Sequence, residues 1–170
     1  MMLRNCKFLL FVSLTLVCLI AFNARSVSAE DPGLEGWEES SEYNGHYNVN
    51  ELDSFRGVFQ EVIDITPLSG MAPGVGIIVE DQDGDLVKVH LGPKSFVKMD
   101  SVGLRKGDKV KVKGVWADID GQEVFMASKV KNKSRGENVE LKVRLTSDGT
   151  PFWTMTPEQL AKEMQPTPDE

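Results

Sequence analysis

The chain has 170 residues, with 26 Asp and Glu against 19 Lys and Arg and a formal net charge of −7. Its two cysteines, Cys6 and Cys18, both lie in the first 29 residues, so the rest of the chain holds none. That excludes a disulfide framework, a Cys-ligated zinc site, an iron–sulfur cluster and a cysteine nucleophile from the remaining 141 residues. One small domain with polar flanks is the natural organisation at this length.

The N-terminal segment has the pattern of an export signal. Arg4 and Lys7 precede an apolar run over residues 8–22, and small residues at 27–29 follow it. A permanent membrane anchor would need roughly 20 apolar residues, which is more than this run contains. We therefore expect residues 1–29 to be a signal peptide cleaved after Ala29, which leaves a periplasmic or secreted protein with no stable membrane anchor.

Residues 30–54 predict an acidic, largely disordered leader. They carry eight Asp and Glu, no Lys or Arg, and Gly, Ser and Asn without a period. Because the first 29 residues hold three bases and no acid, the chain that follows them has a net charge of −10. The aromatic residues Trp37, Tyr43 and Tyr47 interrupt the leader, and we expect them to be incidental to a solvated tail.

Five short apolar runs with clear turn residues between them predict strands, over residues 55–65, 75–80, 86–91, 109–117 and 123–130. Asp83-Gly84 separates the second run from the third, and Asp120-Gly121 separates the fourth from the fifth. Asp followed by Gly tolerates the positive φ of a tight hairpin turn, so both pairs of runs are expected to be hairpins. Residues 94–102 predict one or two helical turns whose apolar side chains plug one end of the fold.

Three strands, a short helix and two further strands is the order of an OB-fold. The sequence thus predicts an all-β domain over residues 55–146, a five-stranded Greek-key barrel with one extra strand at 139–145. A small β-sandwich or a two-hairpin roll is the alternative. Residues 147–170 are expected to be a tail with a short helix that starts at Thr156 and Pro157.

Several motifs in the strand region carry a resemblance. Leu-Gly-Pro at 91–93, Lys-Gly-Asp at 106–108, Val-Lys-Gly-Val-Trp at 112–116, Asp-Gly at 120–121 and Val-Phe-Met-Ala at 124–127 resemble the small exported bacterial OB-fold proteins of the BOF type. The resemblance covers about residues 55–132. It implies a periplasmic binding or stress-related module without a known catalytic role.

The periplasmic haem chaperones of cytochrome c maturation are a second group of OB-folds with a similar fifth strand. Those proteins attach haem through a His-x-x-x-Tyr segment just after the barrel. Residues 129–133, Lys-Val-Lys-Asn-Lys, contain neither His nor Tyr, which disfavours covalent haem attachment. The similar topology still suggests an alternative function, that of an accessory or assembly factor for an exported redox, haem or metal-handling system.

Alternation along the strands predicts a basic outer face. Val87, Val89 and Leu91 point inward by this pattern and Lys88 and His90 outward, while Lys111 and Lys113 alternate with inward-facing valines. From Lys88 to Arg144 there are 14 bases and seven acids, so the strand region is basic within an acidic chain. We predict that Lys88, His90, Lys111 and Lys113 bind an exported protein partner or a small anionic ligand, although lysines that merely keep a strand face solvated would give the same pattern.

Two further interpretations concern aromatic side chains. OB-folds bind oligonucleotides or oligosaccharides over stacked aromatics on strands two and three, but here these strands offer few outward aromatics, so such binding is a second alternative and nucleic acid is disfavoured. The Pro-Phe-Trp segment at 151–153 would cap the core, or dock a partner through Phe152 and Trp153 if these are exposed.

No catalytic or metal-binding signature is found. Gly74-Val75-Gly76 lacks the third glycine of a dinucleotide loop, and the acidic group at 81–85 lacks the glycine and closing glutamate of a calcium loop. His46 and His90 stand on separate segments and belong to no zinc motif. The sequence thus predicts a non-enzymatic binding module without a cofactor or metal.

Overall fold

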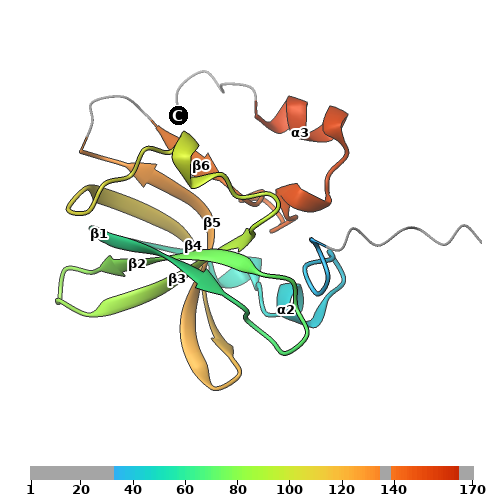
Figure 1. Ribbon diagram of the computed structural model, residues 1–170, viewed down its shortest axis with the longest axis horizontal. Coiled ribbons are helices and arrows are strands. Elements are labelled where there is room, and N and C mark those ends of the chain that lie inside the picture. Colours follow the sequence, from blue (N-terminus) through green and yellow to red (C-terminus); the bar gives the residue numbers. More distant parts are fainter. Residues whose placement is uncertain (1–32, 135–138, 165–170) are drawn as a thin grey trace, which may run out of the picture. The chain divides into compact units, whose positions relative to one another are not determined.

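The computed structural model describes residues 33–134 and 139–164 (Figure 1). The predicted signal peptide lies outside the described residues. The elements are α2 (Glu42–Gly45), η1 (Val49–Glu51), β1 (Asp53–Ile65), β2 (Gly74–Glu80), β3 (Leu86–Pro93), η2 (Met99–Ser101), β4 (Lys109–Ile119), β5 (Gln122–Asn132), β6 (Glu140–Lys142), η3 (Phe152–Thr154) and α3 (Pro157–Glu163). The prediction of an all-β protein is confirmed.

All five predicted strands and the sixth, short one are present. β2 pairs with β3 and β4 pairs with β5, both antiparallel, so the two predicted hairpins are confirmed. Asp120 and Gly121 have φ values of 52° and 75°, the left-handed conformation that a two-residue hairpin turn with Asp-Gly requires. Figure 1 shows this β4–β5 hairpin extending beyond the other strands.

The strands form one sheet in the order β3-β2-β1-β4-β5-β6. In addition, β3 pairs with β5 in parallel, through Val89 opposite Phe125 and His90 opposite Met126. Each of β1 to β4 therefore has two neighbouring strands and β5 has three, and only β6 lies at an edge with a single partner among the described residues. In β5, Ser128 is an extra residue, since Lys113 faces Lys129 and Gly114 faces Ala127. This bulge changes which residues of β5 point inward on its two sides.

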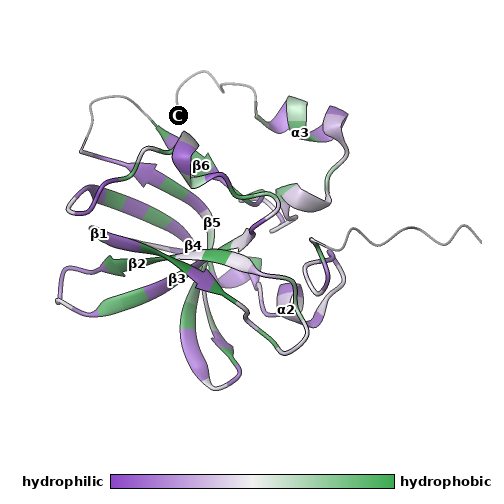
Figure 2. Cartoon of the chain, viewed as in Figure 1, coloured by the Kyte–Doolittle hydropathy of each residue, from purple (hydrophilic) through white to green (hydrophobic). Residues whose placement is uncertain are grey.

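The inner face of the sheet forms the main core. Val110 and Val112 on β4 are 1% and 0% exposed, and Val87, Val89 and Leu91 on β3 are also buried, as alternation predicts. Figure 2 shows apolar and polar residues alternating along several of these strands. Trp116 lies on the same face as Val112, where it packs edge-on against Phe125 at a centroid distance of 5.0 Å, but it remains 37% exposed.

The prediction of a disordered acidic leader is wrong for residues 33–54. Trp37 and Tyr43 are 0% and 1% exposed, and Trp37 donates a 2.8 Å hydrogen bond from Nε1 to the carbonyl of Ala72. α2 begins after Ser41, whose side chain accepts from the N–H of Asn44. The acidic composition led to the prediction of disorder. A few buried aromatic side chains can nevertheless order a segment whose other residues stay in water.

The predicted helical connection and C-terminal helix both have counterparts. Within residues 94–102 the regular element is the one-turn η2. Val97, one of the apolar side chains predicted to plug the end of the fold, is buried. α3 has the predicted Thr156 cap and Pro157 in the first turn, completed by a reciprocal bond with Gln159. None of the helices in the described parts of the chain is long and apolar enough to cross a membrane.

Candidate functional site

The structure does not bring the four predicted ligand-binding residues together. Lys88 lies on the outer face of β3 and donates a 2.8 Å hydrogen bond to the side chain of Gln122 at the start of β5. Lys111 and Lys113 lie on β4, where they face Arg56 and Ser54 of β1 on one side and Lys131 and Lys129 of β5 on the other. His90 pairs with Met126, and Met126 pairs with Val115, so these three buried residues form a row across the strands. This row separates Lys88 from Lys113.

The prediction that His90 faces solvent is wrong. His90 is 4% exposed, because Tyr43 of the N-terminal segment lies over it with a ring centroid distance of 6.0 Å. The Tyr43 hydroxyl and Nδ1 of His90 are 3.4 Å apart. Burial, with a smaller contribution from the nearby charge of Lys88, lowers the pKa of His90 to about 4, so the imidazole is neutral at pH 7.

Phe152 and Trp153 do not form an exposed docking site either. They are 2% and 7% exposed. Trp153 donates a 2.7 Å hydrogen bond from Nε1 to the carbonyl of Trp37 and packs edge-on against the ring of Trp37. These aromatics join the N-terminal segment to the C-terminal one, which is the capping role that their large apolar area favours over docking.

The bases that do come together form a regular array on the outer face of β4, β5 and their neighbours. Strand register aligns them in rows: Arg56, Lys111 and Lys131 form one row, and Lys113, Lys129 and the β6 residue Lys142 form the next. A third row holds Lys109, whose carbonyl accepts a 2.7 Å hydrogen bond from the N–H of Lys133. We call this set the lysine array; its members are Arg56, Lys109, Lys111, Lys113, Lys129, Lys131, Lys133 and Lys142.

One carboxylate lies within the array. Glu140 of β6 contacts three of its lysines, with N–O distances of 3.7 Å to Lys129, 3.8 Å to Lys131 and 3.4 Å to Lys142. These side chains are 23–32% exposed, so the cluster is partly shielded from water. Partial burial strengthens charge interactions compared with fully exposed pairs.

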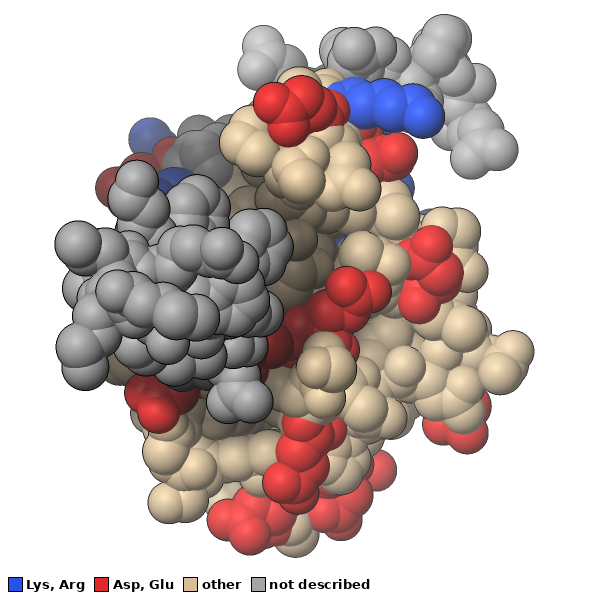
Figure 3. Space-filling model, turned by 90° about the vertical axis from the view of Figure 1, so that its right-hand side faces the viewer, with Lys and Arg blue, Asp and Glu red and all other residues tan. Residues whose placement is uncertain are grey.

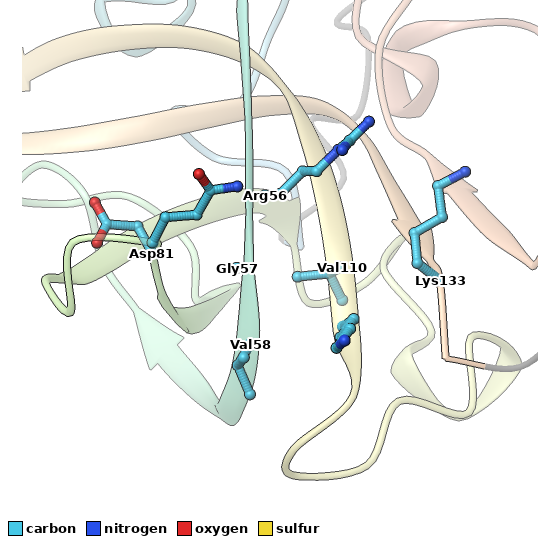
Figure 4. Close-up of a pocket in the computed structure, with 8 residues that line it drawn as sticks. Arg56, Gly57, Val58, Asp81, Val110 and Lys133 are labelled. Carbon is cyan, nitrogen blue, oxygen red and sulfur yellow. The ribbon is translucent and has the colours of Figure 1, made fainter.

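The β1–β4 half of the array has no such partner. Within residues 33–134 and 139–164, Arg56, Lys111 and Lys113 form no ion pair. A hollow of about 590 Å³ beside Arg56 is lined by Lys109, Lys133 and Asp81, among others. Figure 4 shows Arg56 and Lys133 extending to one side of this hollow and the carboxylate of Asp81 pointing to the other. Asp81 instead accepts the backbone N–H groups of Asp83 and Asp85 within its own turn.

Acidic side chains gather elsewhere. Residues 33–53 contain six exposed acids and no Lys or Arg: Glu35, Glu38, Glu39, Glu42, Glu51 and Asp53. Figure 3 shows a face of the molecule on which Asp and Glu greatly outnumber Lys and Arg. Opposite charges are therefore segregated on the surface, and the acidic N-terminal segment packs over His90 instead of neutralising the array.

Sequence reasoning found Lys111 and Lys113 but missed the other bases of the array. The signal was present, because Lys-Val-Lys-Val-Lys at 109–113 and Lys-Val-Lys-Asn-Lys at 129–133 have the same alternation. Neither run shows that the two align side by side, since the register depends on the Asp120-Gly121 turn and on the bulge at Ser128. In the described parts of the chain, no group of three His, Cys, Asp or Glu side chains could hold a metal ion.

Comparison with known protein families identifies the family to which the strand region belongs. The model of the MamS/MamX magnetosome protein family matches residues 51–136. The chain belongs to this family. No curated protein and no solved structure matches the chain significantly.

The family match covers β1 to β5 and seven of the eight bases of the array; Lys142 and Glu140 lie beyond it. It also excludes residues 33–50, which pack over His90. The match does not confirm the resemblance to the exported OB-fold proteins of the BOF type, which remains a prediction.

Proposed function

We propose that this protein is an accessory or assembly module of the magnetosome that acts by binding an anionic partner, without catalysis. The observation that carries the proposal is the lysine array, in which eight bases come together on neighbouring strands and the carboxylate of Glu140 contacts three of them. Membership of the MamS/MamX family supports the magnetosome association. Electrostatic complementarity of this kind gives a module its choice of partner and a fast association rate.

The ring of strand pairings supports an OB-fold. In that architecture the first strand pairs with the second and fourth, and the third strand closes the barrel against the fifth. Here β1 pairs with β2 and β4, and β3 pairs with β5, with a short 3-10 turn between β3 and β4. We infer that β1 to β5 form an OB-fold barrel whose outer face on β4 and β5 carries the array.

A binding role agrees with the positions of the groups that have perturbed pKa values. Active sites usually concentrate such groups in a cleft. Burial raises the pKa of Tyr43 to about 12 and lowers the pKa of Arg144, but both side chains are packed inside the molecule, at 1% and 3% exposure. Their role is to hold the N-terminal segment against the sheet.

The proposal includes export. We expect residues 1–29, which lie outside the described residues, to direct the chain out of the cytoplasm as a cleaved signal. The alternative role in redox, haem or metal handling also describes an accessory factor, but the lysine array favours an anionic partner over a cation.

Co-sedimentation with purified magnetosomes tests the proposal. Wild-type protein should sediment at low ionic strength and be released as salt rises, because screening weakens contacts between exposed charges. The double variant K111E/K113E should lose most of its binding, while the control K106E/K162E, which changes the same charge at exposed lysines outside the array, should bind like wild type. Equal binding of both variants would contradict the proposal.

A further inference from the structure

We propose that the β1–β4 half of the lysine array is a binding site for an extended acidic peptide segment that presents carboxylates on one face. This inference rests on the proposed function and specifies the chemistry of the partner. The occupant is a segment of another protein, and its contacts are made by Arg56, Lys109, Lys111 and Lys113.

The chain itself fills the other half of the array with a carboxylate. β6 is an extended segment of three residues paired with β5, and it brings the carboxylate of Glu140 within 3.4–3.8 Å of three lysines. A carboxylate delivered by an extended backbone is therefore a ligand that this surface already accepts. The array offers the same chemistry at Arg56, Lys111 and Lys113 without an ion-pair partner among the described residues.

The spacing of the lysines along β4 matches the side-chain spacing of an extended peptide. Lys109, Lys111 and Lys113 stand at every second position of β4, so they lie on the same outer face. The Cα atoms of successive lysines are about 7 Å apart. An extended peptide repeats its side chains on one face with the same period. A peptide with acids at every second position, lying along β4, can therefore place one carboxylate near each of these three lysines.

The bases of the β1–β4 half are accessible to a partner. Arg56 and Lys109 are exposed and Lys111 and Lys113 are half-buried, and the hollow beside Arg56 leaves room next to β4. The acidic side chains that line this region, Asp81 and Asp83, belong to the β2–β3 hairpin and form no ion pair with the array in the described parts of the chain. The chain's own acidic residues at 33–53 belong to a segment anchored over His90 by Tyr43.

Fluorescence anisotropy with labelled peptides tests the inference on the purified protein. The probe is a peptide with alternating Glu and Thr, and its comparison is a peptide of the same composition with the Glu residues in one block. We expect the alternating peptide to bind at least about threefold more tightly, and K111Q/K113Q to weaken that binding by about tenfold or more. The control K106Q/K162Q should change it by less than about twofold. Thermal unfolding of each variant shows that the fold is kept.

The remaining outcomes separate this inference from the broader proposal. If polyphosphate or vesicles containing phosphatidylglycerol bind in a way that depends on Lys111 and Lys113, while neither peptide does, the acidic-peptide inference is wrong and the anion-binding face stands. Equal affinity for the two peptides overturns the extended geometry. If no anionic probe depends on these lysines, both the inference and the proposed function are wrong.

Discussion

The guanidinium of Arg144 donates a 2.6 Å hydrogen bond to the side-chain oxygen of Asn44, across 100 positions of sequence. Asn44 in turn donates to the carbonyls of Trp37 and Glu38, at 3.0 and 2.7 Å. Arg144 also lies 4.7 Å from the ring centroid of Trp153. This buried arginine therefore ties the N-terminal segment to the residues that follow β6, using aromatic faces and an amide in place of a carboxylate.

Replacing Arg144 by Ala should release the N-terminal segment. The substitution removes the bond to Asn44 and the stacked contacts, and we expect a loss of about 2–4 kcal/mol in the free energy of unfolding. Urea denaturation measures the loss, and limited proteolysis should show faster cleavage within residues 37–47. Lys in place of Arg144 is the matched control for charge, and it should restore only part of the stability because an ammonium lacks the planar stacking surface. Full stability of the Ala variant would contradict the role of Arg144.

His90 should make stability depend on pH. Its pKa is about 4 in the folded protein and near 6.5 when unfolded, so the unfolded state binds more protons between these values. Stability contributed by the neutral imidazole is complete above pH 6.5 and is lost as the pH falls through about 4, by at most about 3 kcal/mol. Urea unfolding of wild type and of His90→Gln at several pH values in this window measures the effect. The Gln variant should lose this part of the pH dependence, and parallel profiles for the two proteins would refute the assignment.

Gly114→Ala should destabilise the sheet at the β5 bulge. A Cβ at this position would collide with the carbonyl of Met126 and come within 2.9 Å of the Cα of Ala127. Because the obstacle is backbone, we expect a loss of about 1–3 kcal/mol. Gly45→Ala is the control, since nothing lies within 4 Å of its added Cβ and its φ is not positive. Thermal unfolding of the two variants should differ clearly, and equal midpoints would show that the sheet accommodates the methyl group.

Removing the carboxylate of Glu140 should strengthen the binding of acidic peptides. Three lysines lose their partner in Glu140→Gln, so the free charge of the array rises. Affinity for the alternating Glu-Thr peptide should increase by about threefold or more at low salt, with little change near molar salt. The stability of the variant should fall by no more than about 1 kcal/mol, since partly exposed ion pairs contribute little. Unchanged or weaker peptide binding would mean that Glu140 does not compete for these lysines.

The local features of the strand region were predictable because they depend on neighbours in sequence. Asp120-Gly121 specifies a tight turn wherever it stands between β-rich runs, and Thr156-Pro157 specifies a helix start. Alternation placed Val110 and Val112 inside and Lys111 and Lys113 outside, as the structure confirms for the valines. His90 follows the same alternation, but the side chains that cover it come from a segment more than 40 positions away.

By itself the sequence determined the strands, their hairpins, the C-terminal helix and the basic character of the outer strand face, because each of these follows from periodicity and local turn chemistry. Only the tertiary structure decided that the acidic segment folds over His90, that Phe152 and Trp153 are covered, and that bases from four strands form one array in which three contact Glu140. The physical reason is that burial and cross-strand register arise from contacts between distant parts of the chain, and a single bulged residue or a few buried aromatics can set them.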